Sequence, residues 1–164
     1  MKFGQFELVR WHQDVSYADS INRAMEKIEL GDQMGMDEIW LAEHHFSRHG
    51  LVSGIFSLLG NAAARTKNAR IGTAVVVLPF HHPIQVAEEA ATIDILSGGR
   101  LTLGVGVGYQ RMEFEAYGLD IGEARQRFRE YLEVIKKAWQ PEPLTYKGDF
   151  IDVQGVRVMP KPLQ

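Results

Sequence analysis

Strand-like and helix-like segments alternate along this chain, and this alternation constrains the fold more than any other feature. Short runs rich in β-formers cover residues 3–8, 38–42, 71–78 and 101–107, and a helix-like segment follows each of them. The repeat of about 30 to 35 residues is typical of parallel strands joined by right-handed helical crossovers. We therefore expect an α/β fold with four strand-helix units.

Capping and breaking residues delimit the helices between these strands. The first is expected after the capping pair Ser16 and Asp19, the second over 55–65, the third over 83–96, and the fourth after Asp120 and Glu123. Beyond the fourth helix, residues 144–146 and 150–153 flank a glycine-containing turn and predict a small β-hairpin. The strand at 38–42 lacks alternation, which predicts a strand covered on both faces.

Two architectures share this pattern, and the pattern alone does not separate them. The closed eight-stranded barrel and the open doubly wound sheet both repeat strand and helix in this order. Four units cannot close a barrel by themselves. In both architectures, however, functional residues gather at the carboxyl ends of the strands.

Composition excludes several function classes. The net charge of -3 comes from well-mixed charges, so neither nucleic acid nor an anionic membrane is an expected partner. The chain has no cysteine, which removes disulfides, thiolate metal sites and thiol nucleophiles. No apolar stretch approaches the roughly 20 residues of a membrane span, and we expect a cytoplasmic protein.

Histidines concentrate where the predicted strands end. Four of the six fall there, as the pairs His44-His45 and His81-His82, and Glu43 precedes the first pair. Histidine titrates nearest neutrality, so this placement suits proton transfer. Adjacent strand-end side chains point to opposite faces, so only one of His44 and His45 should reach the barrel axis. Loop packing is the simpler explanation for His81 and His82.

Other readings of the strand ends carry less weight. Histidines and Glu43 could ligate a metal, but no established ligand spacing is present, so we expect no metal site. The alternating Gly104, Gly106 and Gly108 do not open a helix as a dinucleotide fingerprint would. They leave room either for a flat ligand or for tight barrel packing, and Arg125 could bind phosphate or simply be solvated.

Several motifs together resemble the bacterial luciferase-like family. The resemblance spans nearly the whole chain, including a stretch at 146–150 and a closing stretch at 160–164 that lead into that family's fifth strand. The most specific segments are Trp40-Leu41-Ala42-Glu43-His44-His45-Phe46, Ile71-Gly72-Thr73-Ala74-Val75-Val76, Gly99-Arg100-Leu101, and Gly108-Tyr109 with Glu113-Phe114.

The resemblance implies a single partial domain over residues 1–164. It would be the amino-terminal half of a (βα)8 TIM-type barrel, with strands and helices one to four, ending before the fifth strand. The implied enzyme is an FMN-dependent monooxygenase that takes reduced flavin from a separate reductase and uses dioxygen to oxidise a small organic substrate. A homodimer is the implied assembly.

The resemblance also assigns site residues. His44 is implied as the catalytic histidine in proton transfer, and His45 as its structural neighbour. Ala74-Val75 matches a non-proline cis peptide against which the flavin ring packs. Gly106, Gly108 and Tyr109 would line the same ring, and Arg125 would contact the flavin phosphate; Val107 departs from the family, which often has an arginine there.

Two alternatives remain open from the sequence. One is a deazaflavin-dependent oxidoreductase that transfers hydride and does not use dioxygen. The other is a non-catalytic half-barrel that self-assembles and binds flavin weakly or not at all.

Overall fold

The computed structural model describes residues 1–164, which divide into two compact units. The first unit contains Met1–Val76 and Leu96–Val105, and the second contains Val77–Ile95 and Gly106–Gln164. No helix in the chain combines the length and the apolar character that a membrane crossing requires.

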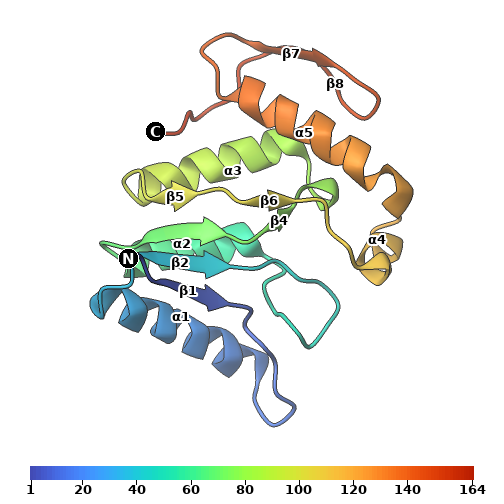
Figure 1. Cartoon of the computed structure of the whole chain (residues 1–164). Coiled ribbons are helices and arrows are strands. Elements are labelled where there is room, and N and C mark those ends of the chain that lie inside the picture. Colours follow the sequence, from blue (N-terminus) through green and yellow to red (C-terminus); the bar gives the residue numbers. More distant parts are fainter. The chain divides into compact units, whose positions relative to one another are not determined.

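A four-stranded parallel sheet organises the first unit (Figure 1). The strand order is β1-β2-β3-β5, so sequential strands are neighbours, as the crossover pattern predicts. Phe6, Trp40, Gly72 and Thr102 lie side by side in register across it. Its elements are β1 (Gly4–Glu7), α1 (Tyr17–Gln33), β2 (Glu38–Leu41), α2 (Ile55–Arg65), β3 (Arg70–Thr73) and β5 (Leu101–Thr102).

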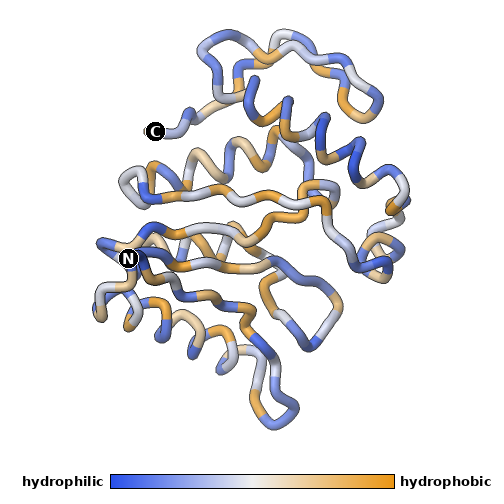
Figure 2. The backbone as a smooth tube through the Cα atoms, viewed as in Figure 1, coloured by the Kyte–Doolittle hydropathy of each residue, from blue (hydrophilic) through white to orange (hydrophobic).

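The core of this unit lies between the sheet and its two helices. Ile39, Leu41 and Ile71 from the strands are each 1% exposed, and Ile28 of α1 and Leu59 of α2 are buried as well. Figure 2 shows hydrophobic stretches along these strands and alternating hydrophobic and hydrophilic turns along α1. Helix α1 begins as predicted, with the Asp19 amide donating to Ser16 Oγ at 3.0 Å.

The prediction that the second strand is covered on both faces is wrong. Ile39 and Leu41 are buried, but Glu38 and Trp40 on the other face are only partly covered. The core between the sheet and helices α1 and α2 lies on the Ile39 face. On the other face Trp40 packs across Gly72, where an added Cβ would lie 2.6 Å from the Trp40 ring. The Ile39 face of the sheet is therefore fully buried, and the Trp40 face is only partly buried.

The predicted continuous strands at 71–78 and 101–107 are each interrupted. β3 ends at Thr73, and β4 (Val76–Val77) and a short 3-10 helix η1 (Leu78–Phe80) follow; β5 is likewise separated from β6 (Val105–Gly106), which pairs with β4. Thr73 Oγ1 donates to the Gly104 carbonyl at 2.7 Å and accepts from the Gly104 amide at 2.9 Å. This side chain replaces the backbone ladder at the break.

Helices dominate the second unit. Its core includes Val86 and Ala90 of one helix and Val134 and Ile135 of another, and Trp139 Nε1 donates to the Ala87 carbonyl at 3.0 Å. Its elements are α3 (Pro83–Leu96), α4 (Arg111–Ala116), a 3-10 helix η2 (Ile121–Glu123), α5 (Ala124–Ala138), β7 (Leu144–Lys147) and β8 (Asp152–Val156).

Two details of this unit differ from the sequence prediction. Asp120 caps the short helix η2, through a bond from the Gly122 amide at 2.8 Å, and α5 begins only at Ala124. Helix α4 is not predicted, because six residues are too few to show a helical period. The hairpin is present, but its second strand begins two residues later than predicted.

Candidate active site at the carboxyl ends of β2 and β3

His44 lies directly beyond β2 and is half-buried. Its amide donates to the Val52 carbonyl at 3.3 Å, which ties the residue to the far end of its own loop. Gly50 lies against it so closely that a Cβ there would be 3.0 Å from both His44 Cβ and the Leu8 carbonyl oxygen. The bond to Val52 and the close approach of Gly50 therefore hold the backbone and Cβ of His44 within its loop.

The neighbouring histidine has a different environment. His45 is 4% exposed, and its Nε2 lies 2.7 Å from Oε1 of Glu43, which is 3% exposed. This buried pair of ionisable side chains, joined by a short polar contact, anchors the start of the loop after β2. The two adjacent histidines thus separate, one into the interior and one onto a cavity wall.

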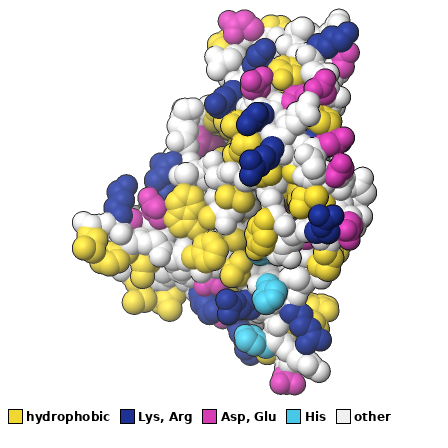
Figure 3. Space-filling view, turned by 45° about the vertical axis from the view of Figure 1, so that its right-hand side comes forward, with side chains coloured by type: hydrophobic (Ala, Val, Ile, Leu, Met, Phe, Trp, Pro, Cys, Tyr) yellow, Lys and Arg dark blue, Asp and Glu magenta, His cyan; other side chains and the backbone are white.

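That cavity, which we call the His44 pocket, has a volume of about 410 Å³. It is lined by the first residue of α1 and by residues of the loops after β1 and β2: Trp11, Tyr17, His44, Phe46, Ser47, Arg48, Gly50, Leu51 and Ser53. Figure 3 shows histidine side chains at the surface beside Lys and Arg side chains, with hydrophobic side chains close by. The pocket therefore combines aromatic walls, one imidazole and one guanidinium.

The segment Ala74-Val75 lies at the same edge of the sheet. The peptide bond between these residues is cis, and both residues are half-exposed. The Ala74 amide donates to the Leu41 carbonyl at 2.7 Å, and the Glu43 amide donates to the Val75 carbonyl at 3.3 Å. The structure thus brings together the ends of β2 and β3 and, with them, two of the predicted site elements.

The remaining predicted site residues belong to the second unit. Gly108 has a φ of +81°, and a Cβ there would lie 2.7 Å from Val77 Cγ1 and 3.1 Å from Phe114. Tyr109 is 76% exposed, and Arg125 is exposed on α5. Gly106, like Val107, is half-exposed in this stretch.

The surface open to a flat cofactor is at Ala74-Val75. Close packing accounts for two of the glycines, since a Cβ on Gly104 would strike the Thr73 carbonyl oxygen and one on Gly108 would meet Val77 and Phe114. Ala74 and Val75 present a small, partly uncovered surface. No comparable fit exists for a metal, since no three His, Asp or Glu side chains are grouped to hold one.

The second histidine pair is less distinctive. His81 is half-buried and His82 is exposed, directly before the first turn of α3. The His81 amide donates to the Leu78 carbonyl at 3.0 Å, which closes the turn η1. The loop role that the sequence suggested for the pair stays a prediction.

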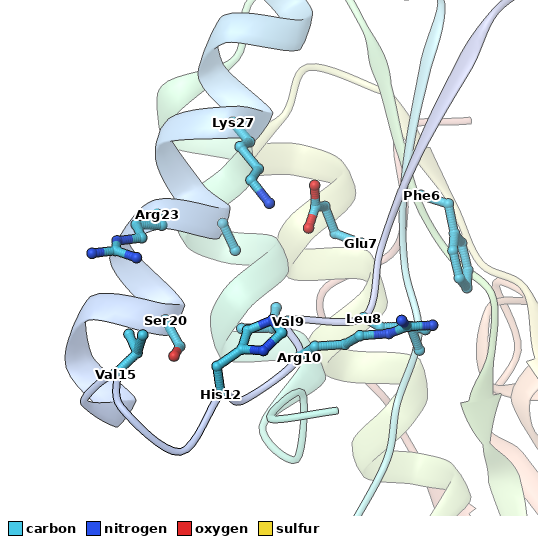
Figure 4. Close-up of a pocket in the computed structure, with 11 residues that line it drawn as sticks. Phe6, Glu7, Leu8, Val9, Arg10, His12, Val15, Ser20, Arg23 and Lys27 are labelled. Carbon is cyan, nitrogen blue, oxygen red and sulfur yellow. The ribbon is translucent and has the colours of Figure 1, made fainter. Parts of the chain in front are cut away.

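Sequence reasoning missed a second cavity, of about 560 Å³, between the end of β1 and α1 (Figure 4). Three cations line it, Arg10, Arg23 and Lys27, with Glu7 as the one carboxylate among its lining residues. Figure 4 shows Lys27 extending toward Glu7 and Arg23 pointing away. The i, i+4 spacing of Arg23 and Lys27 was the available signal.

The chain belongs to the luciferase-like monooxygenase family, whose model matches residues 1–164. It is 39% identical to the 4-hydroxyprotoasukamycin monooxygenase of Streptomyces nodosus subsp. asukaensis, over 87% of this chain and 39% of that protein. It is 37% identical to the oxygenase component of the flavin-dependent trigonelline monooxygenase of Acinetobacter baylyi, over 85% of this chain and 39% of that protein.

Structural similarity agrees with the sequence matches. A monooxygenase of Streptomyces bottropensis superposes with a TM-score of 0.95 at 31% identity, over 100% of this chain and 50% of that one. The chain thus spans half or less of the length of these relatives. The predicted family is confirmed, and so is the predicted fold, an amino-terminal half of a luciferase-like (βα)8 barrel.

Proposed function

We propose that the protein containing this chain is a flavin-dependent monooxygenase that uses reduced FMN and dioxygen to oxidise a small organic substrate. The observation that carries the proposal is His44 on a pocket wall beside the half-exposed Ala74-Val75, in a chain of this family. When bound, reduced flavin supplies the electrons that reduce dioxygen, so that one oxygen atom enters the substrate and the other leaves as water.

The chain's own residues would bind, orient and move protons. His44 is the group that can donate and accept a proton at the pocket wall. The buried contact between Glu43 and His45 holds the start of the loop that carries His44. Ala74 and Val75 offer a surface for the flavin ring. We propose that Gly106, Gly108 and Tyr109 also contact the ring and that Arg125 binds the flavin phosphate.

A separate flavin reductase is part of this proposal. The trigonelline enzyme is named as an oxygenase component. That name supports a two-component arrangement for the protein that contains this chain. We further propose a cytoplasmic homodimer. Light scattering of the intact protein, alone and mixed with a flavin reductase, checks the assembly.

A deazaflavin is the second candidate cofactor; the apolar Val107, where luciferase-like sequences often have an arginine, suggests a different pose of the cofactor. Titrating the intact protein with reduced FMN and then with reduced deazaflavin separates the two cofactors. We expect reduced FMN to bind and to support substrate-dependent consumption of dioxygen. Binding of deazaflavin alone, without dioxygen consumption, would replace the monooxygenase by a hydride-transfer enzyme.

A further inference from the structure

We propose that the His44 pocket is the substrate site and that it selects a planar molecule carrying an anionic group, with Arg48 as the residue that recognises the anion. This inference rests on the proposed function, because it assigns a substrate class to the same site.

Aromatic side chains give the pocket its preference for flat ligands. The rings of Trp11 and Tyr17 lie 4.8 Å apart at a tilt of 46°, and Phe46 lines the same cavity. Trp11 is fixed by a hydrogen bond from its Nε1 to the Val15 carbonyl at 2.7 Å. A volume of about 410 Å³ lies within the usual range for small-molecule sites, and the held Trp11 ring favours a flat ligand over a flexible chain.

Charge sets the second requirement. No carboxylate is among the residues that line the pocket, whereas Arg48 and His44 both are. Arg48 is exposed, and its guanidinium lies 4.6 Å above the Trp11 ring and donates to Gln13 Oε1 at 3.4 Å, so both of these partners are neutral. A guanidinium beside an aromatic wall matches the paired oxygens of a carboxylate or a similar anion.

The two loops are held in conformations that favour a preformed site. Val9 and Phe46 have φ values of 51° and 55°, in the left-handed region that non-glycine residues rarely adopt. They occupy the loops that follow β1 and β2. The Trp11 amide donates to the Arg48 carbonyl and the Leu51 amide to the Val9 carbonyl, both at 3.1 Å, so the loops are joined across the pocket. Unusual backbone of this kind clusters at binding sites.

Calorimetry with a matched ligand pair tests the inference on the intact protein, without flavin. The probes are 2-naphthoate and its uncharged counterpart 2-naphthamide. We expect 2-naphthoate to bind more tightly, and Arg48→Gln to weaken it by about 10- to 100-fold, the usual range for a charge-assisted bond. Arg48→Lys should retain part of the affinity, and 2-naphthamide should not distinguish Arg48→Gln from the unaltered protein.

Two further variants complete the design. Trp11→Leu should weaken both probes, because it removes an aromatic wall. Arg65→Gln is the matched control: Arg65 is an exposed arginine of α2 that pairs with Glu29 outside the pocket, so its loss should leave both affinities unchanged. The inference is overturned if 2-naphthoate does not bind, or if it binds Arg48→Gln and the unaltered protein with equal affinity. Failure of dioxygen consumption with intact Arg48-dependent binding overturns the proposed function instead.

Discussion

At Gly50, the absence of a side chain determines where His44 can lie. Because an added Cβ would meet His44 Cβ and the Leu8 carbonyl oxygen at 3.0 Å, either the imidazole or the backbone of the β1 loop must move to admit it. His44 itself is visible in the sequence, from its place at a strand end. Arg48, Trp11 and Phe46 are not, because aperiodic loops give no sign of which side chains converge.

We predict that Gly50→Ala lowers the free energy of unfolding by about 1 to 3 kcal/mol, the range for overpacking a filled position. Gly60→Ala is the control: nothing lies within 4 Å of its added Cβ, and Gly60 is inside helix α2. There alanine should raise the free energy of unfolding by about 1 kcal/mol. Urea denaturation of both variants provides the comparison, and equal effects would refute the packing argument.

At the scale of elements, each unit contains a carboxylate that accepts three consecutive backbone N–H groups. In the first unit, Asp32 at the end of α1 accepts from Lys67, Asn68 and Ala69 at 2.9, 2.9 and 2.6 Å. Burial would raise the pKa of Asp32, but these three bonds and the charge of Arg100 outweigh it, so its pKa is lowered. The loop before β3 is thus fixed by an ionised carboxylate.

A pH dependence follows for this loop. A carboxylate whose pKa is lowered by folding stabilises the protein above its unfolded pKa of about 3.9, and this contribution is lost as the pH falls through the lower folded value. Asp32→Asn should therefore reduce the free energy of unfolding at neutral pH and flatten its decline below about pH 4. Urea denaturation over that pH range measures the free energy of unfolding. If that free energy falls as steeply with acid in Asp32→Asn as in the unaltered protein, Asp32 is not the source of the decline.

Glu130 of α5 has the corresponding role in the second unit. Its carboxylate accepts from the amides of Asp149, Phe150 and Ile151 at 3.0, 3.0 and 2.7 Å, and a Cβ on Gly148 would strike it. We predict that Glu130→Gln loosens the β7–β8 turn, at a loss of about 1 to 3 kcal/mol. Faster hydrogen exchange at residues 149–151 is the expected signature, and unchanged exchange there would contradict it.

At the scale of the whole molecule, the order of elements could be predicted, because apolar periodicity and capping are local properties of the chain. The strand breaks could not, since the bonds between Thr73 and Gly104 join residues far apart in sequence. The same holds for the His44 pocket, which needs two loops at once. Among the predicted site residues, the structure groups His44 with Ala74-Val75 through the β2 and β3 ends.

The sheet itself predicts how residues 1–164 behave alone. Strand β1 has a neighbour on one side only, and Phe6 on it is 54% exposed. An open parallel sheet edge with apolar side chains favours association. We expect this segment, prepared alone, to form dimers or larger species in light scattering, and a monodisperse folded monomer would contradict that expectation.

The central claim is that His44 moves protons in a flavin-dependent oxidation, and substrate-dependent dioxygen consumption by the intact protein with reduced FMN tests it most directly. His44→Ala should slow turnover by about 100-fold or more, the range for losing a general acid or base, with the free energy of unfolding nearly unchanged. His49→Ala, at an exposed position of the same loop, should have the rate of the unaltered protein. A His44→Ala protein that folds and turns over at the full rate would contradict the account.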